Sequence, residues 1–293
     1  MSAVRVVVVG DVMLDVVTRP TAPIAATSDT AAVTRVGRGG SGANLAVALA
    51  RPGLEVTYVG AAGRDASAAV IVDDLTRAGV RARLQDEDGA TGVVVAVVAP
   101  DGQRAMITDR GANPRLRIDH VAGVLDEPFD HLHVSGYTVL DEHTRPVATA
   151  ALELARRAGA TTSVDVCSVA PLRAVGSVVF SRAVAAATTL FANEEEALAL
   201  AGRADLERAV VDLAATFAEV VVTRGAGGAL ARRGDREWRV DAASAVVLDT
   251  TGAGDAATGA YLAATLLGGE PGEALAAAMA AAAVVVAGLG ARG

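Results

Sequence analysis

Short runs rich in valine alternate along the chain with longer stretches in which apolar residues recur at helical spacing. The short runs are VRVVVVGD, EVTYVG, HLHVSG, TTSVDV, EVVVTRG and SAVVLDTTG. The longer stretches include ANLAVALARPG, ASAAVIVDDLTRAGV, RPVATAALELARRAG and LERAVVDLAATFA. Continuous apolar runs are typical of strands buried on both faces, and strands that alternate with helices indicate a parallel sheet. The pattern therefore predicts an α/β fold with a doubly wound, mostly parallel sheet between helices.

Two segments, residues 18–38 and 91–110, do not fit this alternation. The first is rich in Pro, Thr and Ala, and the second reads as a hairpin that turns at Pro100-Asp101-Gly102. No linker rich in Pro, Gly or Ser divides the rest of the chain. We therefore expect residues 1–293 to form a single domain, with the two segments inserted as a small β lid. The exposed edges of such a lid offer a surface for a homodimer.

Composition narrows the classes of partner and chemistry. The chain has 26 Lys+Arg against 34 Asp+Glu, a net charge of −8, which disfavours nucleic acid and anionic membranes as partners. Lys is absent, so neither a Schiff-base lysine nor a P-loop lysine is available. Cys167 is the single cysteine, which excludes an intrachain disulfide and a thiolate zinc site and favours the cytoplasm.

The apolar residues are small. They make up 52% of the chain while aromatic residues make up 3%, so the core has to be built from Ala, Val and Leu. This favours helices that pack closely on parallel strands. The apolar stretch 274–290 is shorter than the ~20 residues that span a bilayer, and we interpret it as a buried helix.

The densest group of glycines and polar residues is Asp249-Thr250-Thr251-Gly252-Ala253-Gly254-Asp255, between the SAVVL run and a helix expected at 256–267. Ligands of parallel sheets bind beyond the carboxyl ends of the strands. Gly252 and Gly254 allow a ligand to approach the backbone, and the amides of a first helical turn form an anion site. Asp255 has two interpretations here, an N-cap of the helix or a catalytic base.

A second glycine-rich segment raises a different class of function. Gly37, Gly39 and Gly42 spell G-x-G-x-x-G, the fingerprint of nicotinamide dinucleotide binding. That fingerprint also requires an acid at the end of the next strand, about 20 residues on. Glu55 begins the EVTYVG strand instead, and Asp65 follows a further turn. An NAD-binding oxidoreductase is therefore the alternative, with an incomplete match.

Asn193-Glu194-Glu195-Glu196 follows the TLFA run and opens a helix expected at 197–201. Asn followed three residues later by Glu is close to a capping box. The alternative interpretation is a carboxylate that holds hydrated magnesium near phosphates. His131 and His133 alternate on one strand, but no third ligand lies near them in the sequence, which disfavours a zinc site.

Taken together, GGSGAN near the start and DTTGAGDAATGA near the end resemble the two signatures of the ribokinase-like (PfkB) carbohydrate kinase family. Asn193-x-x-Glu196 lies between them, as the N-x-x-E motif of that family does. The resemblance extends over nearly the whole chain. It implies an α/β sandwich with a β lid, ATP as phosphoryl donor, magnesium as the required metal and often a monovalent cation such as potassium. The implied acceptor is a hydroxyl of a small sugar or sugar-like molecule, with a nucleoside as the alternative.

The resemblance also implies roles for individual residues. Asp255 is the general base, and the amides of Gly252, Ala253 and Gly254 form the anion hole. The remaining assignments are Asn193 and Glu196 to magnesium through water, Asp249, Thr251 and Gly290 to potassium through backbone oxygens, Thr223, Gly225 and Gly228 to the nucleotide, and Asp11, Asp15, Gly40 and Asn44 to the acceptor hydroxyls.

Departures from the ribokinase pattern affect the acceptor. Met13 stands where ribokinases commonly have a polar sugar contact, and Ser135-Gly136-Tyr137 stands where they supply an acid. Ribose is therefore not assigned. Arg38 and Arg110 near the expected lid leave a sugar acid open as acceptor.

Overall fold

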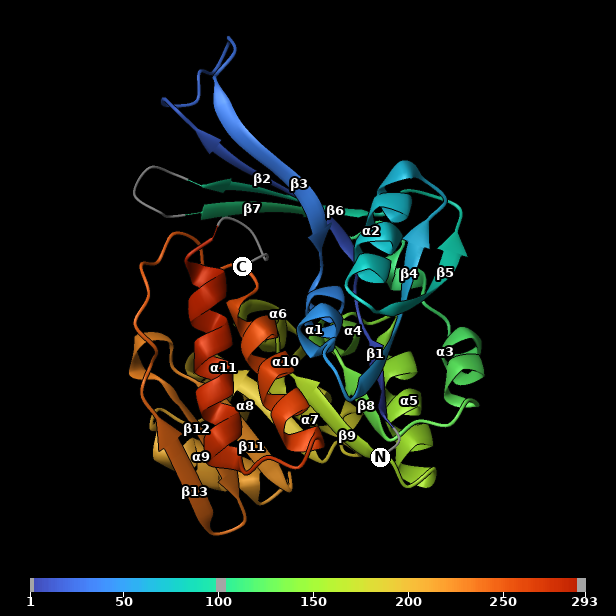
Figure 1. The fold of residues 1–293 in the computed structure, drawn as a ribbon, viewed down its shortest axis with the longest axis vertical. Helices are drawn as coiled ribbons and strands as arrows, with labels where there is room; N and C mark the ends of the chain where they lie inside the picture. The colour runs from blue at the N-terminus through green and yellow to red at the C-terminus, as the bar shows by residue number, and fades with distance from the viewer. Residues whose placement is uncertain (1–2, 99–103, 289–293) are drawn as a thin grey trace.

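The computed structural model describes residues 3–98 and 104–288, which form a large sheet between two layers of helices and a smaller sheet at one end (Figure 1). Over these ranges the large sheet has nine strands. In spatial order they are β13 (Arg236–Val240), β12 (Ala229–Arg233), β11 (Glu219–Thr223), β10 (Thr189–Asn193), β9 (Thr161–Asp165), β8 (His131–Val134), β1 (Val4–Val9), β4 (Leu54–Gly63) and β5 (Arg81–Glu87).

The strands from β11 to β5 are all parallel, and β12 and β13 add an antiparallel hairpin at one edge. The predicted doubly wound, mostly parallel sheet is therefore confirmed. Val6, Val7, Val8 and Val9 of β1 are all buried, as expected of a central strand covered on both faces. Because the strands are parallel, their carboxyl ends share one edge, and the small sheet lies beside that edge (Figure 1).

Helices cover both faces of the sheet, and each layer packs around its own hydrophobic cluster. One layer consists of α1 (Ser41–Leu49), α2 (Ala66–Arg77), α10 (Ala253–Leu266) and α11 (Pro271–Val286). The other consists of α3 (Ile118–Leu125), α4 (Gly136–Leu140), α5 (Arg145–Arg157), α6 (Val169–Val175), α7 (Ser177–Ala183), α8 (Glu194–Ala201) and α9 (Leu206–Ala214).

The expected helix at 274–290 is α11, which begins at Pro271 and ends at Val286. No helix in the described ranges is long and apolar enough to cross a bilayer.

Small residues bring the helices close together, as the composition predicts. A Cβ placed on Gly259 of α10 would lie 2.5 Å from the Cβ of Ala48 in α1, so glycine is required at this crossing. The close approach of α1 and α10 matters for function, because the two glycine-rich segments of the sequence form the amino-terminal ends of these helices.

The smaller sheet has four strands in the described ranges, in the order β3 (Ala32–Gly39), β2 (Met13–Pro20), β6 (Gly92–Val98) and β7 (Arg104–Asp109). Both segments that did not fit the helix and strand alternation therefore lie outside the large sheet, as expected. The small sheet begins earlier than expected, at Met13, so Asp15 belongs to it. The hairpin turn predicted at residues 100–102 lies outside the described residues.

The strand expected in the SAVVL run, residues 244–248, is absent and that prediction is wrong. Val246 and Val247 are 76% and 62% exposed, and the Leu248 and Asp249 amides both donate to the carbonyl oxygen of Val286 at the end of α11. Residues 244–248 do not pair with β13, the edge strand of the sheet, and the end of this run is bonded to α11 instead. A short apolar run alone does not distinguish these situations.

Candidate active site

A cavity of about 730 Å³ lies between the carboxyl ends of the main strands and the small sheet. It collects residues from the ends of β1, β9, β10 and β11, from α4, from the small sheet and from the starts of α1 and α10. The structure therefore brings together most of the residues expected in the site. Those that line the cavity are Asp11, Asp15, Gly40, Asn44, Asn193, Glu196, Thr223, Thr251, Gly252, Gly254 and Asp255.

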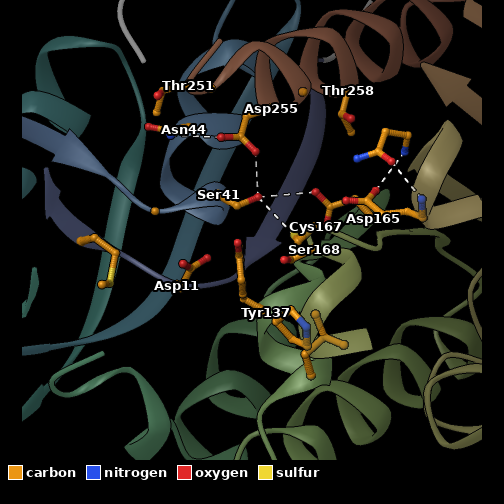
Figure 2. A pocket seen from close by; sticks show the side chains of 18 of the residues that line it. Asp11, Ser41, Asn44, Tyr137, Asp165, Cys167, Ser168, Thr251, Asp255 and Thr258 are labelled. Atoms are coloured by element: carbon orange, nitrogen blue, oxygen red, sulfur yellow. Dashed lines mark hydrogen bonds between the residues drawn. The ribbon is translucent and has the colours of Figure 1, made fainter. Parts of the chain in front are cut away.

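The helix that carries Asp255 begins earlier than expected, at Ala253 instead of residue 256, with Gly252 as its N-cap residue. Asp255 is therefore the third residue of α10, and its interpretation as the N-cap is wrong. Its carboxylate points across to α1, where it accepts a hydrogen bond from Ser41 Oγ at 2.8 Å and one from Asn44 Nδ2 at 3.0 Å (Figure 2). Two glycine-rich segments more than 200 residues apart thus meet at this carboxylate.

Burial, and after it the nearby carboxyl of Asp165, raise the pKa of Asp255 to about 7, while the hydrogen bonds from Ser41 and Asn44 act in the opposite direction. A carboxylate with a pKa near neutrality is a much stronger proton acceptor than an ordinary Asp, yet it is still partly ionised at neutral pH. Asp255 is therefore suited to general-base chemistry.

The amino-terminal end of α10 has no side-chain cap. Gly252 has a φ of 77°, a left-handed conformation that favours glycine and turns the chain into the helix. Gly254 faces open space, since a Cβ built on it would have no heavy atom within 4 Å. Backbone amides at an uncapped helix start lie at the positive end of the helix dipole and form an anion site. Gly252 and Gly254 line the cavity, whereas the Ala253 amide donates to the carbonyl oxygen of Thr250 at 3.3 Å, so the anion hole expected at these residues stays a prediction.

Glycines at the start of α1 allow this helix to approach the end of β1. Gly40 has a φ of 88°, and a Cβ on it would lie 2.6 Å from the carbonyl oxygen of Asp11. A Cβ on Gly42 would lie 2.6 Å from the Cα of Gly10. In return, Asp11 Oδ1 accepts a hydrogen bond from the Gly42 amide at 3.3 Å. These glycines therefore set the position of Asp11 in the cavity.

The context that a dinucleotide fingerprint requires is missing. β3, which carries Gly37 and Gly39, pairs antiparallel with β2 in the small sheet and is not a parallel strand of the main sheet. Arg38 is buried, donates to Asp74 of α2 at 2.9 Å and also donates to Asn44 Oδ1. Asn44 therefore links Arg38 to Asp255. Arg38 does not line the cavity, which removes it as a contact for a sugar acid.

The start of α8 has the capping box that the sequence predicts. Asn193 Oδ1 accepts from the Glu196 amide, and Glu196 Oε2 accepts from the Asn193 amide, both at 2.9 Å. Glu196 is only 5% exposed, and burial raises its pKa to about 7. Because this carboxylate also lines the cavity, the capping interpretation and the metal interpretation are compatible.

The predicted nucleotide residues divide into two groups. Thr223 ends β11 and lines the cavity. Gly225 and Gly228 lie in the turn that leads to β12, and in the described structure they are not part of the cavity wall. A Cβ on Gly228 would lie 2.0 Å from the carbonyl oxygen of Val240, so this glycine is required for the close approach of β13.

The loop before α10 is held by its own side chains. Asp249 is buried, and its Oδ1 accepts from the amide and the hydroxyl of Thr251, at 2.9 and 2.7 Å. Leu248 and Asp249 are also bonded to the end of α11. This arrangement brings Asp249 and Thr251 close to the carboxyl end of α11. Gly290 lies outside the described residues.

The acceptor side of the cavity combines acids with a single arginine. Burial and the neighbouring Asp11 raise the pKa of Asp15 to about 6. Arg110, at the end of the small sheet, lies 3.9 Å from Asp11 Oδ2, and its guanidinium carbon lies 5.2 Å from the centre of the Tyr137 ring. Its Nε is buried with no hydrogen-bond partner. Among the described residues, Arg110 is the one basic side chain that lines the cavity.

Sequence reasoning missed three residues that organise the site. Ser41 lies between Asp165 and Asp255, and Asn113 bonds to the backbone of both Val12 and Arg110. Asp165 was identifiable, because it ends a buried parallel strand at the edge where ligands bind. Ser41 and Asn113 carry no comparable signal, since their roles depend on contacts between distant segments.

Comparison with known proteins agrees with this geometry. The model of the "pfkB family carbohydrate kinase" matches residues 4–293. An ATP-dependent ribose-1-phosphate kinase from Halopiger xanaduensis is 31% identical over 243 residues, which cover 81% of this chain and 76% of that protein.

Two solved structures share the fold. The adenosine kinase from Sinorhizobium meliloti is 24% identical, with a TM-score of 0.90 over 100% of this chain and 96% of that one. A structure from E. coli in complex with ATP and Mg²⁺ is 22% identical, with a TM-score of 0.87 over 99% of this chain and 94% of that one.

The fold and the site thus define a phosphotransferase that acts on a small molecule. The chain belongs to the pfkB family of carbohydrate kinases. As a member of this family it is a phosphotransferase that phosphorylates a sugar-like acceptor, and the oxidoreductase alternative is not favoured.

Proposed function

We propose that Asp255 is the general base of this kinase and that the start of α10 binds the phosphoryl group in transit. The observation that carries the proposal is the position of Asp255, a carboxylate with a pKa of about 7 in the first turn of an uncapped helix at the cavity wall. An ordinary surface Asp has neither a raised pKa nor a position at an uncapped helix start beside a cavity. A base and an anion site on the same helical turn are what transfer of a phosphoryl group to a hydroxyl requires.

In the reaction, Asp255 takes the proton of the acceptor hydroxyl as its oxygen attacks the γ-phosphorus of ATP. The bond between the γ-phosphorus and the bridging oxygen breaks, and ADP leaves with that oxygen. The hydrogen bonds from Ser41 and Asn44 fix the orientation of the carboxylate. The amides of Gly252, Ala253 and Gly254 stabilise the negative charge on the transferring oxygens.

Glu196 and Asn193 fit a magnesium site reached through water. One oxygen of Glu196 accepts from the Asn193 amide, and the residue lines the cavity. When bound, Mg²⁺ offsets the charge of the ATP phosphates. Mg²⁺ tends to keep several of its waters, and a carboxylate oxygen can accept hydrogen bonds from those waters.

We further propose that Asp249, Thr251 and Gly290 supply backbone oxygens to a potassium ion beside the anion hole. The side-chain bonds of Asp249 to Thr251 constrain this loop at the end of α11. Turnover in potassium should exceed turnover in tetramethylammonium at matched ionic strength. Equal rates in the two cations would contradict the potassium site.

The acceptor is best described as a small sugar whose hydroxyls bond to Asp11 and Asp15. Carboxylates accept hydrogen bonds from neighbouring hydroxyls, and both lie on the cavity wall with Gly40 and Asn44. A nucleoside is the second candidate, because the same wall includes Met13, Val94 and Met106. These apolar side chains offer contact to a flat ring. A screen of ATP consumption over pentoses, hexoses, sugar acids, sugar phosphates and nucleosides distinguishes these acceptors.

We also infer that the protein forms a homodimer through the small sheet and acts in the cytoplasm. Val33, Val36 and Ile107 are 57%, 59% and 66% exposed on β3 and β7, which are the edge strands of this sheet. Apolar edge strands are suited to association. Sedimentation velocity should give the mass of a dimer, and a Val36→Lys variant should shift it toward the monomer. A monomeric native protein would contradict the dimer.

The decisive variant for the proposed function is Asp255→Asn. Asn can still bond to Ser41 and Asn44 but cannot accept the hydroxyl proton, so kcat should fall by about 10² to 10⁴ while ATP binding is kept. Asp141→Asn is the matched control, since Asp141 lines the same cavity but belongs to the end of α4. Asp141→Asn should have a much smaller effect on kcat. An Asp255→Asn enzyme that keeps more than about a tenth of the wild-type kcat would rule out the base assignment.

A further inference from the structure

Two carboxylates in the cavity share one hydroxyl group. Ser41 Oγ lies 2.8 Å from Asp255 Oδ1 and 3.4 Å from Asp165 Oδ2, and Figure 2 shows Ser41 between the two acids. The hydroxyl has a single proton, so it donates to one carboxylate at a time. The shorter distance favours Asp255. Asp165, whose own pKa is raised by burial, then lies without this hydrogen bond close to the proposed base, on the far side of the same serine.

Hydrogen bonds from neighbouring residues fix the Asp165 carboxyl in this position. Its Oδ1 accepts from the Gly136 amide at 2.8 Å and from Cys167 Sγ at 2.9 Å. Cys167 has a φ of 68° and is the one residue other than glycine with a positive φ in the described ranges. Such a conformation is unfavourable for a side chain with a Cβ, and it persists only where the surroundings enforce it. The backbone around Asp165 therefore keeps this carboxyl at the cavity wall.

Among the residues that the structure describes, the one basic group paired with Asp165 is His133, on the core side. His133 Nε2 lies 3.9 Å from Asp165 Oδ1, is buried and has no hydrogen-bond partner. His133 and His131 are joined through the Ser163 hydroxyl, at 2.9 and 2.8 Å. Burial lowers the pKa of His131 to about 4, and burial together with His131 lowers that of His133 to about 3. Both imidazoles are therefore neutral when the enzyme works.

We propose that Asp165 is a positioning residue that acts on Asp255 through Ser41, so that the two acids titrate as a coupled pair. The proposal rests on the assignment of Asp255 as the base. Two carboxylates close together resist being ionised at the same time, and the first proton binds at a higher pH than either acid alone would require. Asp165 therefore makes Asp255 a stronger base, while the Ser41 bond limits this effect by stabilising the ionised form.

The other titratable groups near Asp255 contribute less to its raised pKa than Asp165 does. Asp11 faces the base from the end of β1, Tyr137 faces it from α4, and Cys167 follows Asp165. Burial raises the pKa of Tyr137 and of Cys167 above their ordinary values, so both are neutral near pH 7. Asp11 lies beside Arg110, which offsets its charge. After burial, Asp165 is therefore the strongest influence on the pKa of the base, and the strongest among its charged neighbours.

Two substitutions test the coupling because they should move the pH dependence in opposite directions. Asp165→Asn removes the negative charge while its oxygen can still accept from Gly136. The acid limb of the kcat/KM profile should therefore shift to lower pH, by roughly one unit. Ser41→Ala removes the bond that stabilises ionised Asp255, so its acid limb should shift to higher pH. A purely structural defect would lower kcat/KM at every pH without moving the limb.

The outcomes separate this inference from the proposed function. Opposite shifts in Asp165→Asn and Ser41→Ala support the coupled pair. An acid limb that stays within about 0.2 units of wild type in Asp165→Asn would overturn it. If Asp165→Asn fails to fold, as judged by thermal unfolding, Ser41→Ala decides alone, and an unshifted limb overturns the coupling. An active Asp255→Asn enzyme would instead refute the base itself.

Discussion

The starts of α8 and α10 form two parts of the same cavity wall, and they use the same helix position differently. Each has a carboxylate as its third residue, Glu196 in α8 and Asp255 in α10. Glu196 bonds back to its own N-cap residue, whereas Asp255 turns away from its helix to Ser41 and Asn44. The first helix start is therefore capped by its own side chains, whereas the second has no side-chain cap. An acid at a helix start that it does not cap, as at Asp255, therefore indicates a role in function and not in helix capping.

Among the variants that test this comparison of the two helix starts, Glu196→Gln should have the largest effect on turnover. Gln can replace Glu in a capping box, so the free energy of unfolding should change little. Loss of the negative charge should lower turnover at limiting magnesium by about 10- to 100-fold, with partial recovery at high magnesium.

Asn193→Ala is the converse variant. It removes the side-chain cap and should destabilise the protein by about 1 kcal/mol, measured by denaturant unfolding. If Glu196→Gln behaved like wild type at every magnesium concentration, Glu196 would be a cap and nothing more.

A smaller effect, on both activity and stability, is expected from Gly254→Ala. Alanine in a helix is more stable than glycine by up to about 1 kcal/mol, and the new Cβ meets no protein atom. The methyl group would instead occupy the space where we place the transferring phosphoryl group, so kcat should fall several-fold while the melting temperature rises.

The matched control is Glu195→Ala, at the same position of α8, where the side chain is 63% exposed. This variant should leave kcat nearly unchanged. A Gly254→Ala enzyme with wild-type turnover would contradict an anion site at the start of α10.

The smallest effect concerns stability against pH. The folded-state pKa of Asp255 lies above that of an ordinary Asp, so the folded protein binds this proton more tightly than the unfolded chain does. Stability should therefore fall as the pH rises from about 4 through about 7. Asp255→Asn removes this penalty and should melt at a higher temperature than wild type at pH 8, with no difference at pH 4. A variant less stable than wild type at pH 8 would show that Asp255 supports the fold.

The same two helix starts show what the sequence can predict. The spacing of Asn193 and Glu196 is a local signal, and the predicted capping box is present. The glycines before Asp255 predicted a helix start, and α10 begins there, but the strand expected before them is absent, because a short apolar run does not record whether it pairs with a sheet. The sharing of Ser41 by Asp165 and Asp255 joins segments 124 and 214 residues apart, and no local pattern records such a contact.

The small sheet illustrates the same limit. Its two segments were identifiable because they break the alternation of helices and strands. Its first strand, β2, pairs parallel with β6 and antiparallel with β3, which places Asp15 in the small sheet and not in the main one. Strand pairing is set by tertiary contacts. The sequence therefore identified the two segments that form this sheet but not the residue at which the sheet begins.

The most direct test of the account is the pH profile of kcat/KM for the wild-type enzyme with its best acceptor. We expect activity to fall below an apparent pKa near 7, because protonated Asp255 cannot accept the hydroxyl proton. Glu196 has a similar pKa, so the profile is repeated with Glu196→Gln, which should keep the same limb. A profile that stays flat from pH 8 to pH 5, or a limb that disappears in Glu196→Gln, would contradict Asp255 as the base.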